Sequence, residues 1–143
     1  RRIIPCMFPP PAPWKQVAPA EPDREYVAFA SRFYLKSFWR VPGFMLASIR
    51  IMKQLDGSPG IVGWAMAADI PRLEFHTISV WEDAEALRRF NRAGDHGAVL
   101  TSFAGAMKRS GTFVQYPVLG ADLPIDWPAA LARVNEQIAR QAR

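Results

Sequence analysis

The strongest constraint in this chain is an eight-residue segment, Ile61 to Ala68, that carries no charge on either side. Side chains of a strand alternate between the two faces of its sheet. Here both alternating sets are apolar or glycine, so both faces of this strand must be covered. The chain therefore needs packing partners on both sides of one sheet.

Alternation of side chains with a period of two predicts four strands in all. They lie at residues 26–33, 61–68, 73–81 and 112–118. The second and third strands are joined by a short turn, so they form an antiparallel hairpin. Pro117 lacks a backbone donor, which favours an edge position for the fourth strand.

Apolar residues at helical spacing predict three helical regions, which begin near Pro42, Asp83 and Asp126. The second region is interrupted at Gly94 and continues behind Asp95. The predicted order is strand, helix, strand, strand, helix, strand and an added C-terminal helix. This is the βαββαβ order of a ferredoxin-like α+β fold with an antiparallel four-stranded sheet.

With both long helices on one face of the sheet, the opposite face needs a cover. We expect a second copy of the chain to provide it, which gives a sheet-on-sheet homodimer. The alternative is that the C-terminal helix covers this face within one chain.

The first 22 residues differ from the rest because they hold seven of the 13 prolines. Proline fixes φ and removes a donor, so residues 1–22 are predicted to be a proline-rich arm, either a disordered tail or docked on the body. Residues 23–143 then form one domain.

Composition excludes several classes of protein. No apolar run is long enough for a membrane span. The single cysteine, Cys6, cannot form an internal disulfide, which allows a reducing compartment, and we expect the protein in the cytoplasm. The basic residues Arg88, Arg89, Arg92, Lys108 and Arg109 are interleaved with the acidic residues Glu82, Asp83, Glu85 and Asp95, so a solvated helix face and no nucleic-acid partner is expected.

The segment from Phe75 to Asp83, followed by Leu87, Phe90 and His96, resembles the dimeric α/β-barrel monooxygenase-like proteins. It is similar to their antibiotic-biosynthesis monooxygenase and spheroidene monooxygenase-like groups. The resemblance covers roughly residues 26–133 and implies the fold described above and an oxygenase-type activity.

The resemblance also implies roles for single residues. Trp81 matches a tryptophan that borders the cleft between helices and sheet, and His96 matches the iron ligand of haem-binding relatives. Two departures are present. His76 stands where an apolar or aromatic residue is usual, and the first strand lacks the asparagine that haem-degrading relatives use.

The position of His96 in the sequence also supports a role as haem-iron ligand. Behind Asp95 it falls in the first turn of a helix, whose dipole disfavours imidazolium, and haem iron requires a neutral imidazole. Apolar residues that could wall the haem are Phe90, Val99, Leu100 and Phe103. The alternative is a surface histidine between two helices.

Alternation places four residues on one side of the third strand: Phe75, Thr77, Ser79 and Trp81. If this side faces the cleft, the two hydroxyls are the polar contacts of an apolar small-molecule site. The alternative is that Trp81 is ordinary core. His76 points to the other side, where a structural role is expected. Arg32 on the first strand needs an anionic partner, either Glu74 or a ligand carboxylate.

Three functions are compatible with these residues. The first is a haem-binding oxygenase-type enzyme that acts on a small apolar or aromatic molecule, with His96 as iron ligand and Trp81 beside the haem or substrate. The second is an oxygenase without a cofactor that deprotonates a phenolic substrate, for which His76 or His96 is the base available near neutral pH. The third is a non-catalytic protein that binds a hydrophobic ligand.

Overall fold

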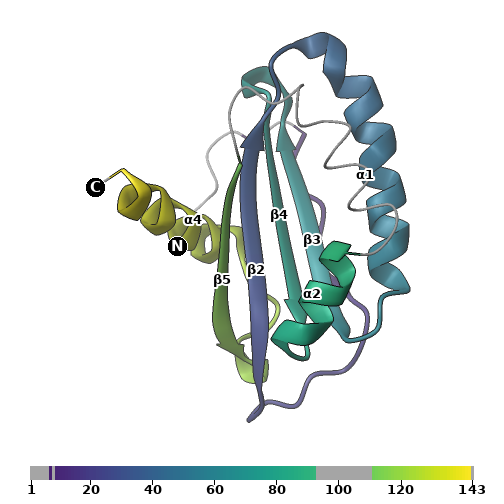
Figure 1. Cartoon of the computed structure of the whole chain (residues 1–143), viewed down its shortest axis with the longest axis vertical. Coiled ribbons are helices and arrows are strands. Elements are labelled where there is room, and N and C mark those ends of the chain that lie inside the picture. Colours follow the sequence, from purple (N-terminus) through teal and green to yellow (C-terminus); the bar gives the residue numbers. More distant parts are fainter. Residues whose placement is uncertain (1–6, 8, 93–110, 143) are drawn as a thin grey trace.

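Five strands form one antiparallel sheet in the order β1-β3-β4-β2-β5 (Figure 1). The structure is a computed structural model that describes residues 7, 9–92 and 111–142. The strands are β1 (Lys15–Gln16), β2 (Glu25–Tyr34), β3 (Ile61–Asp69), β4 (Glu74–Trp81) and β5 (Thr112–Leu119). The helices are α1 (Val41–Asp56), α2 (Ala84–Arg92) and α4 (Trp127–Gln141), with short 3-10 turns η1 (Phe38–Arg40), η2 (Ile70–Arg72) and η4 (Gly120–Asp122).

The elements β2, α1, β3, β4, α2 and β5 follow one another in the predicted order, and the ferredoxin-like α+β fold is confirmed. The sheet has five strands and not the predicted four, because the arm adds β1 to the edge of β3. Lys15 and Gln16 lie between Pro13 and Pro19 and keep the backbone donors that pairing requires. β5, which carries Pro117, is an edge strand as predicted.

Helices α1 and α2 pack on one face of this sheet. Pro42 lies in the first turn of α1, where a missing backbone N–H leaves no gap in the helix. Four apolar residues of α1 are buried: Phe44, Ala47, Ile51 and Leu55. α2 is capped by Asp83, whose Oδ1 accepts a hydrogen bond from the backbone N–H of Ala86 at 2.8 Å. The helical stretch predicted behind Asp95 lies outside the described residues.

The opposite face is covered by the C-terminal helix and by the arm. α4 contacts β5 and β2 (Figure 1) and places Trp127 and Val134 in a core cluster with residues of all four long strands. Met7 and Trp14 of the arm pack against the same cluster. Trp14 lies so close to β3 that a Cβ on Gly63 would clash with its ring. The arm is thus docked on the domain over its described residues.

Both faces of β3 are buried, as the sequence predicts. The cover on the second face, however, comes from the same chain, because α4 and the arm already remove that face from water. Its apolar character therefore does not by itself require a second copy. Of the two covers considered from the sequence, the C-terminal helix is the one observed, and the arm completes it. No helix within the described ranges combines the length and apolarity needed to cross a bilayer.

Candidate functional site

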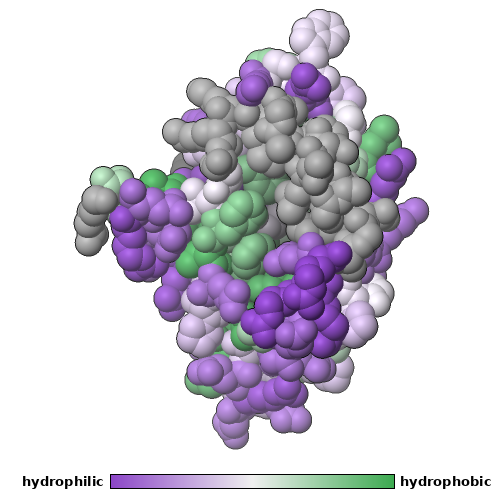
Figure 2. Space-filling model, in the orientation of Figure 1, coloured by the Kyte–Doolittle hydropathy of each residue, from purple (hydrophilic) through white to green (hydrophobic). Residues whose placement is uncertain are grey.

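A cavity of about 240 Å³ lies between the sheet and α1. Its wall contains five phenylalanines from four different elements: Phe29, Phe33, Phe44, Phe75 and Phe113. Met45, Met52 and Met66 add flexible thioethers, and the arm closes one side with Pro9, Pro10 and Ala12. In Figure 2, apolar side chains gather over the middle of the sheet on this face. A cavity of this make-up is suited to an apolar, aromatic ligand.

Two hydroxyls stand in this apolar wall. Ser31 on β2 and Thr77 on β4 are paired in the sheet register, and their oxygens lie 2.5 Å apart. One hydroxyl donates to the other, so the pair keeps one O–H hydrogen that no described group accepts. The hydroxyl of Ser48 on α1 also lines the cavity, but it donates to the carbonyl of Phe44 in its own helix at 2.9 Å. The Ser31–Thr77 pair is therefore the polar feature that a ligand can use.

Trp81 and Ser79 lie on the same side of β4 as Thr77, but in the core beside the cavity. Trp81 is 0% exposed, and its Nε1–H donates to Ser79 Oγ at 2.8 Å. Its ring packs on Phe90 of α2 with centroids 5.1 Å apart. The structure thus brings together three residues predicted for the site, Trp81, Ser79 and Phe90. They belong to the helix–sheet core and not to the cavity wall, whereas Phe75 and Thr77 do line the cavity.

His76 turns its ring away from the cavity. Its neighbours Phe75 and Thr77 point into the cavity, so alternation along β4 directs the imidazole toward α4. The ring lies edge-on to Trp127, with centroids 6.3 Å apart. His76 therefore borders the cavity through its backbone, and its imidazole cannot reach a ligand bound there.

The charge state of His76 follows from its burial. The residue is 2% exposed, and neither ring nitrogen has a hydrogen-bond partner among the described groups. Burial, reinforced by the nearby Arg32 guanidinium, lowers the pKa of His76 to about 4, although Asp69 acts in the opposite direction. Glu74 Oε1 lies 3.3 Å from His76 Nε2, but this contact lacks hydrogen-bond geometry and does not offset the lost hydration. The ring is neutral at pH 7.

Arg32 also lies on the α4 side of the sheet, in register with His76. Its Nη1 donates to Asn135 Oδ1 on α4 at 3.0 Å, and its buried Nε lacks a partner within the described part of the chain. The partner found is thus a neutral amide and not the expected anion. Arg32 does not line the cavity.

Four residues predicted for the site lie outside the described residues: His96, Val99, Leu100 and Phe103. Other residues of the cavity wall were not predicted as site residues. Phe29, Ser31 and Phe33 could have been found, because they alternate along the same side of the first predicted strand. The methionines carry no such signal, since the sequence does not show which apolar helix residues border a cavity.

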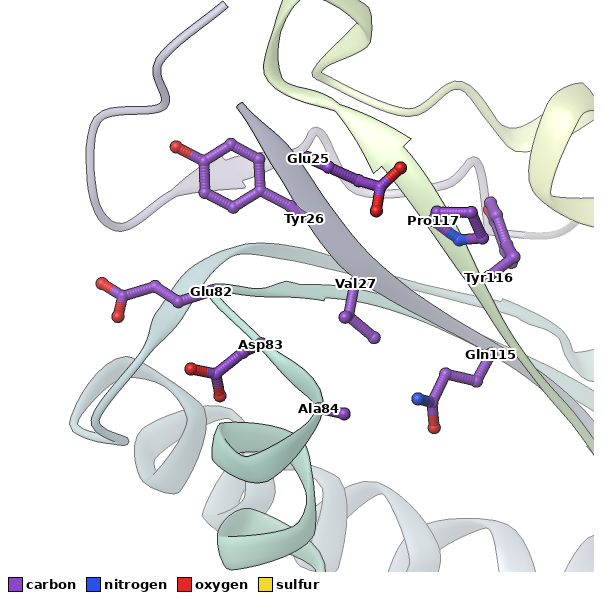
Figure 3. Close-up of a pocket in the computed structure, with 9 residues that line it drawn as sticks. All are labelled: Glu25, Tyr26, Val27, Glu82, Asp83, Ala84, Gln115, Tyr116 and Pro117. Atoms are coloured by element: carbon purple, nitrogen blue, oxygen red, sulfur yellow. The ribbon is translucent and has the colours of Figure 1, made fainter. Parts of the chain in front are cut away.

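A second pocket, of about 360 Å³, opens at one end of the sheet (Figure 3). Figure 3 shows three carboxylates around it, those of Glu25, Glu82 and Asp83. Asp83 is engaged as the cap of α2. Over the described residues, no group of three or more His, Cys, Asp or Glu side chains is arranged to hold a metal ion. We interpret this pocket as a solvated acidic surface.

The described residues of the cavity do not fit haem. The described side chains that point into it include no histidine, cysteine or tyrosine to ligate iron, and methionine ligates haem iron together with a histidine; they also include no lysine or arginine to pair with the propionates. The volume is also below the roughly 300–1,000 Å³ of sites for drug-sized ligands. Haem ligation by His96 thus stays a prediction from the sequence.

The fold and the cavity define a ferredoxin-like α+β protein with an apolar cavity between its sheet and α1, and solved structures share that fold. A candidate monooxygenase from Fusobacterium nucleatum matches with a TM-score of 0.63 and 12% identity, over 74% of this chain and 48% of that one. SnoaB, a cofactor-independent oxygenase from Streptomyces nogalater, matches with a TM-score of 0.54 and 18% identity, over 64% and 90%. A dimeric ferredoxin-like protein of unknown function from Thermobifida fusca matches with a TM-score of 0.55 and 16% identity, over 66% of this chain and 92% of that one.

These neighbours include monooxygenase-like proteins, the class that the segment from Phe75 to Asp83 resembles. At sequence identities this low, the likeness establishes the fold alone. The chain spans about half the length of the Fusobacterium protein. No family model matches the chain, and no curated protein sequence does.

Proposed function

We propose that this protein is an oxygenase-type enzyme that binds a phenolic aromatic molecule in the cavity and uses no cofactor. The observation that carries the proposal is the Ser31–Thr77 pair, a hydrogen-bond donor set in a wall of phenylalanines and methionines. An aromatic ring fits that wall, and a phenolic oxygen fits the donor. The oxygenase activity of SnoaB, which shares the fold, supports the same class of reaction.

The reaction begins with ionisation of the substrate. A hydroxyl that donates to the phenolic oxygen stabilises phenolate more than phenol, because hydrogen bonds to a charged acceptor are stronger. The Ser31–Thr77 pair thus lowers the pKa of the bound phenol, and the proton leaves to water. The phenolate places negative charge on the ring carbon opposite its oxygen, and that carbon reacts with O2.

The products follow from the atom balance. One oxygen atom of O2 is retained on the ring carbon, which becomes the second carbonyl of a quinone. The other oxygen atom leaves as water, with the hydrogens lost from the phenolic O–H and from the ring C–H. The substrate is oxidised and O2 is reduced, so no external reductant is needed.

A homodimer is also proposed, on the model of the dimeric Thermobifida neighbour. Because α4 and the arm cover the second face of the sheet, its interface must use another surface. Analytical ultracentrifugation of the full chain tests this point independently of the activity.

The experiment is oxygen uptake by the metal-free protein with a panel of naphthols and anthrols. We expect uptake with quinone formation, and a drop in kcat/KM of about tenfold or more in Ser31→Ala with Thr77→Val, because either single variant leaves one hydroxyl that can still donate. Ser48→Ala is the matched control, because its hydroxyl lines the cavity but is bonded to its own helix; we expect less than about a twofold change.

Loss of the donor also shifts the pH dependence of kcat/KM to higher pH, because the bound phenol then ionises without a hydrogen bond that lowers its pKa. No uptake across the panel, or unchanged kinetics in Ser31→Ala with Thr77→Val, would contradict the proposal. A hydrophobic molecule that co-purifies with the chain and is not turned over would assign the cavity to ligand binding instead.

A further inference from the structure

Most of the large exposed apolar side chains of the described residues gather in one short stretch. Seven are exposed, and five of them lie between residues 38 and 49. They are Phe38 (58% exposed), Trp39 (92%), Met45 (39%), Leu46 (65%) and Ile49 (48%), named here the apolar patch. Single exposed apolar residues are ordinary, but a contiguous group of them marks an interaction surface.

The patch arises because the first half of α1 is apolar on both sides. Phe44 and Ala47 face the sheet, whereas Leu46 and Ile49 face outward. A helix on the surface of a protein ordinarily has a polar outer face. η1 comes directly before α1 and extends the patch, and Figure 1 shows the start of α1 beyond the ends of the strands. The patch is therefore at a protruding end of the molecule.

The charged side chains around the apolar patch are all basic. Four exposed basic residues flank or interrupt it: Lys36, Arg40, Arg50 and Lys53. No aspartate or glutamate occurs from Tyr26 to Leu55. Within the described part of the chain, none of the four basic side chains forms an ion pair. An apolar patch with a cationic rim complements a surface that is anionic outside and apolar beneath.

We propose that the apolar patch docks this protein on an anionic lipid bilayer. Trp39 and Phe38 are of the type that enters the boundary between headgroups and acyl chains, with Leu46 beside them. The lysines and arginines reach the phospholipid headgroups while their stems lie along the apolar surface. A second copy fits less well, because a two-fold contact would bring the cations of both copies together without a carboxylate in the patch.

The patch continues into the cavity. Met45 belongs to both, and Phe44, Ser48 and Met52 of the same helix line the cavity. Docking through the outer side of α1 therefore brings the cavity next to the apolar phase of the bilayer. This step rests on the proposed function: an apolar aromatic substrate dissolved in the bilayer would enter along α1 without crossing water.

The docking itself is tested without any substrate. The full chain is co-sedimented with vesicles of phosphatidylcholine and phosphatidylglycerol mixed at about two to one, and with vesicles of phosphatidylcholine alone. We expect binding to the anionic vesicles that weakens at high salt. Arg40→Gln with Arg50→Gln should weaken it by about thirtyfold, and Trp39→Ser with Leu46→Ser by about tenfold or more.

Matched controls remove the same kinds of group elsewhere on the surface. Arg89→Gln with Arg140→Gln removes two exposed charges, and Leu119→Ser removes an exposed apolar side chain; neither should change binding by more than about twofold. Brominated lipid should quench tryptophan fluorescence in the wild type and less in Trp39→Phe, which locates the contact. Circular dichroism checks the fold of each variant.

Absence of binding to the anionic vesicles would overturn the proposal, as would equal binding by the patch variants and their controls. If the protein is a dimer that dissociates in Trp39→Ser with Leu46→Ser, the apolar patch is a contact with a second copy, and the proposal is overturned as well. None of these results bears on turnover of a water-soluble phenol, so failure of the docking and failure of the proposed function can be told apart.

Discussion

The indole of Trp14 lies against Gly63 so closely that a methyl group on Gly63 would clash with Trp14 Cζ2. Trp14 belongs to the arm and Gly63 to β3, so this contact fixes the arm to the sheet. The same arm supplies Pro9, Pro10 and Ala12 to the cavity wall. The proline-rich segment is thus part of both the core and the candidate site.

Gly63→Ala should release the arm. The added methyl cannot coexist with the indole, and overpacking of this kind costs about 1–3 kcal/mol. We expect a lower free energy of unfolding in urea and faster tryptic cleavage after Lys15. Gly57→Ala is the control, because the nearest atom to its Cβ would be Lys53 O at 4.0 Å. Equal cleavage rates in the two variants would contradict the contact.

Trp81→Phe tests whether Trp81 is structural. The substitution removes the hydrogen bond to Ser79 Oγ and part of the packing on Phe90, with an expected loss of about 2–4 kcal/mol in the free energy of unfolding. Oxygen uptake per folded molecule should stay within about threefold of wild type. A well-folded Trp81→Phe protein without turnover would place Trp81 in the active site, as the family resemblance implies.

The stability of the protein should fall in mild acid because of His76. Its pKa is about 4 in the fold against an ordinary value of 6.5, so between these pH values the unfolded chain binds a proton that the folded chain does not. The stabilisation is complete above about pH 6.5 and is lost as the pH falls toward 4, by about 3 kcal/mol in all. Arg32, Asp69 and Glu74 are the charged groups around the ring.

Urea unfolding at a series of pH values measures this effect. His76→Leu should abolish the slope between about pH 6.5 and pH 5, above the range where carboxylates titrate. A wild-type protein whose stability is constant over that range would show that the ring is solvated and not buried.

Ala68→Phe should fill the cavity. Ala68 is a half-buried residue of its wall, and a phenyl ring there occupies space that an aromatic ligand needs. We expect the affinity for an aromatic probe to fall by about tenfold or more in a fluorescence titration. Ala132→Phe, on the exposed side of α4, is the control. Unchanged binding by Ala68→Phe would place the ligand elsewhere.

The periodicity of the chain was enough to predict the order of the elements. The strand from Ile61 to Ala68 shows in its composition that both of its faces are buried, and the hairpin follows from the short turn after it. The alternation of Phe75, Thr77, Ser79 and Trp81 correctly puts them on one side of β4. These are local properties, because they depend on spacing within one element.

The candidate site was predicted less completely. Thr77 and Trp81 lie on the same face of β4. Thr77 nevertheless lines the cavity and Trp81 is buried in the core, because α2 packs over the Trp81 end of the strand. Spacing along β4 cannot show where the helices end. For the same reason, the pairing of Ser31 with Thr77 depends on the register between two strands that are far apart in the sequence.

The amino-acid sequence by itself determined which side chains share a face and that the sheet needs cover on both sides, since these follow from the period of the backbone. Only the tertiary structure decided what provides the cover. Trp14 and Trp127 come from opposite ends of the chain, and their packing on one sheet face depends on shape and proximity in space, which no local pattern encodes.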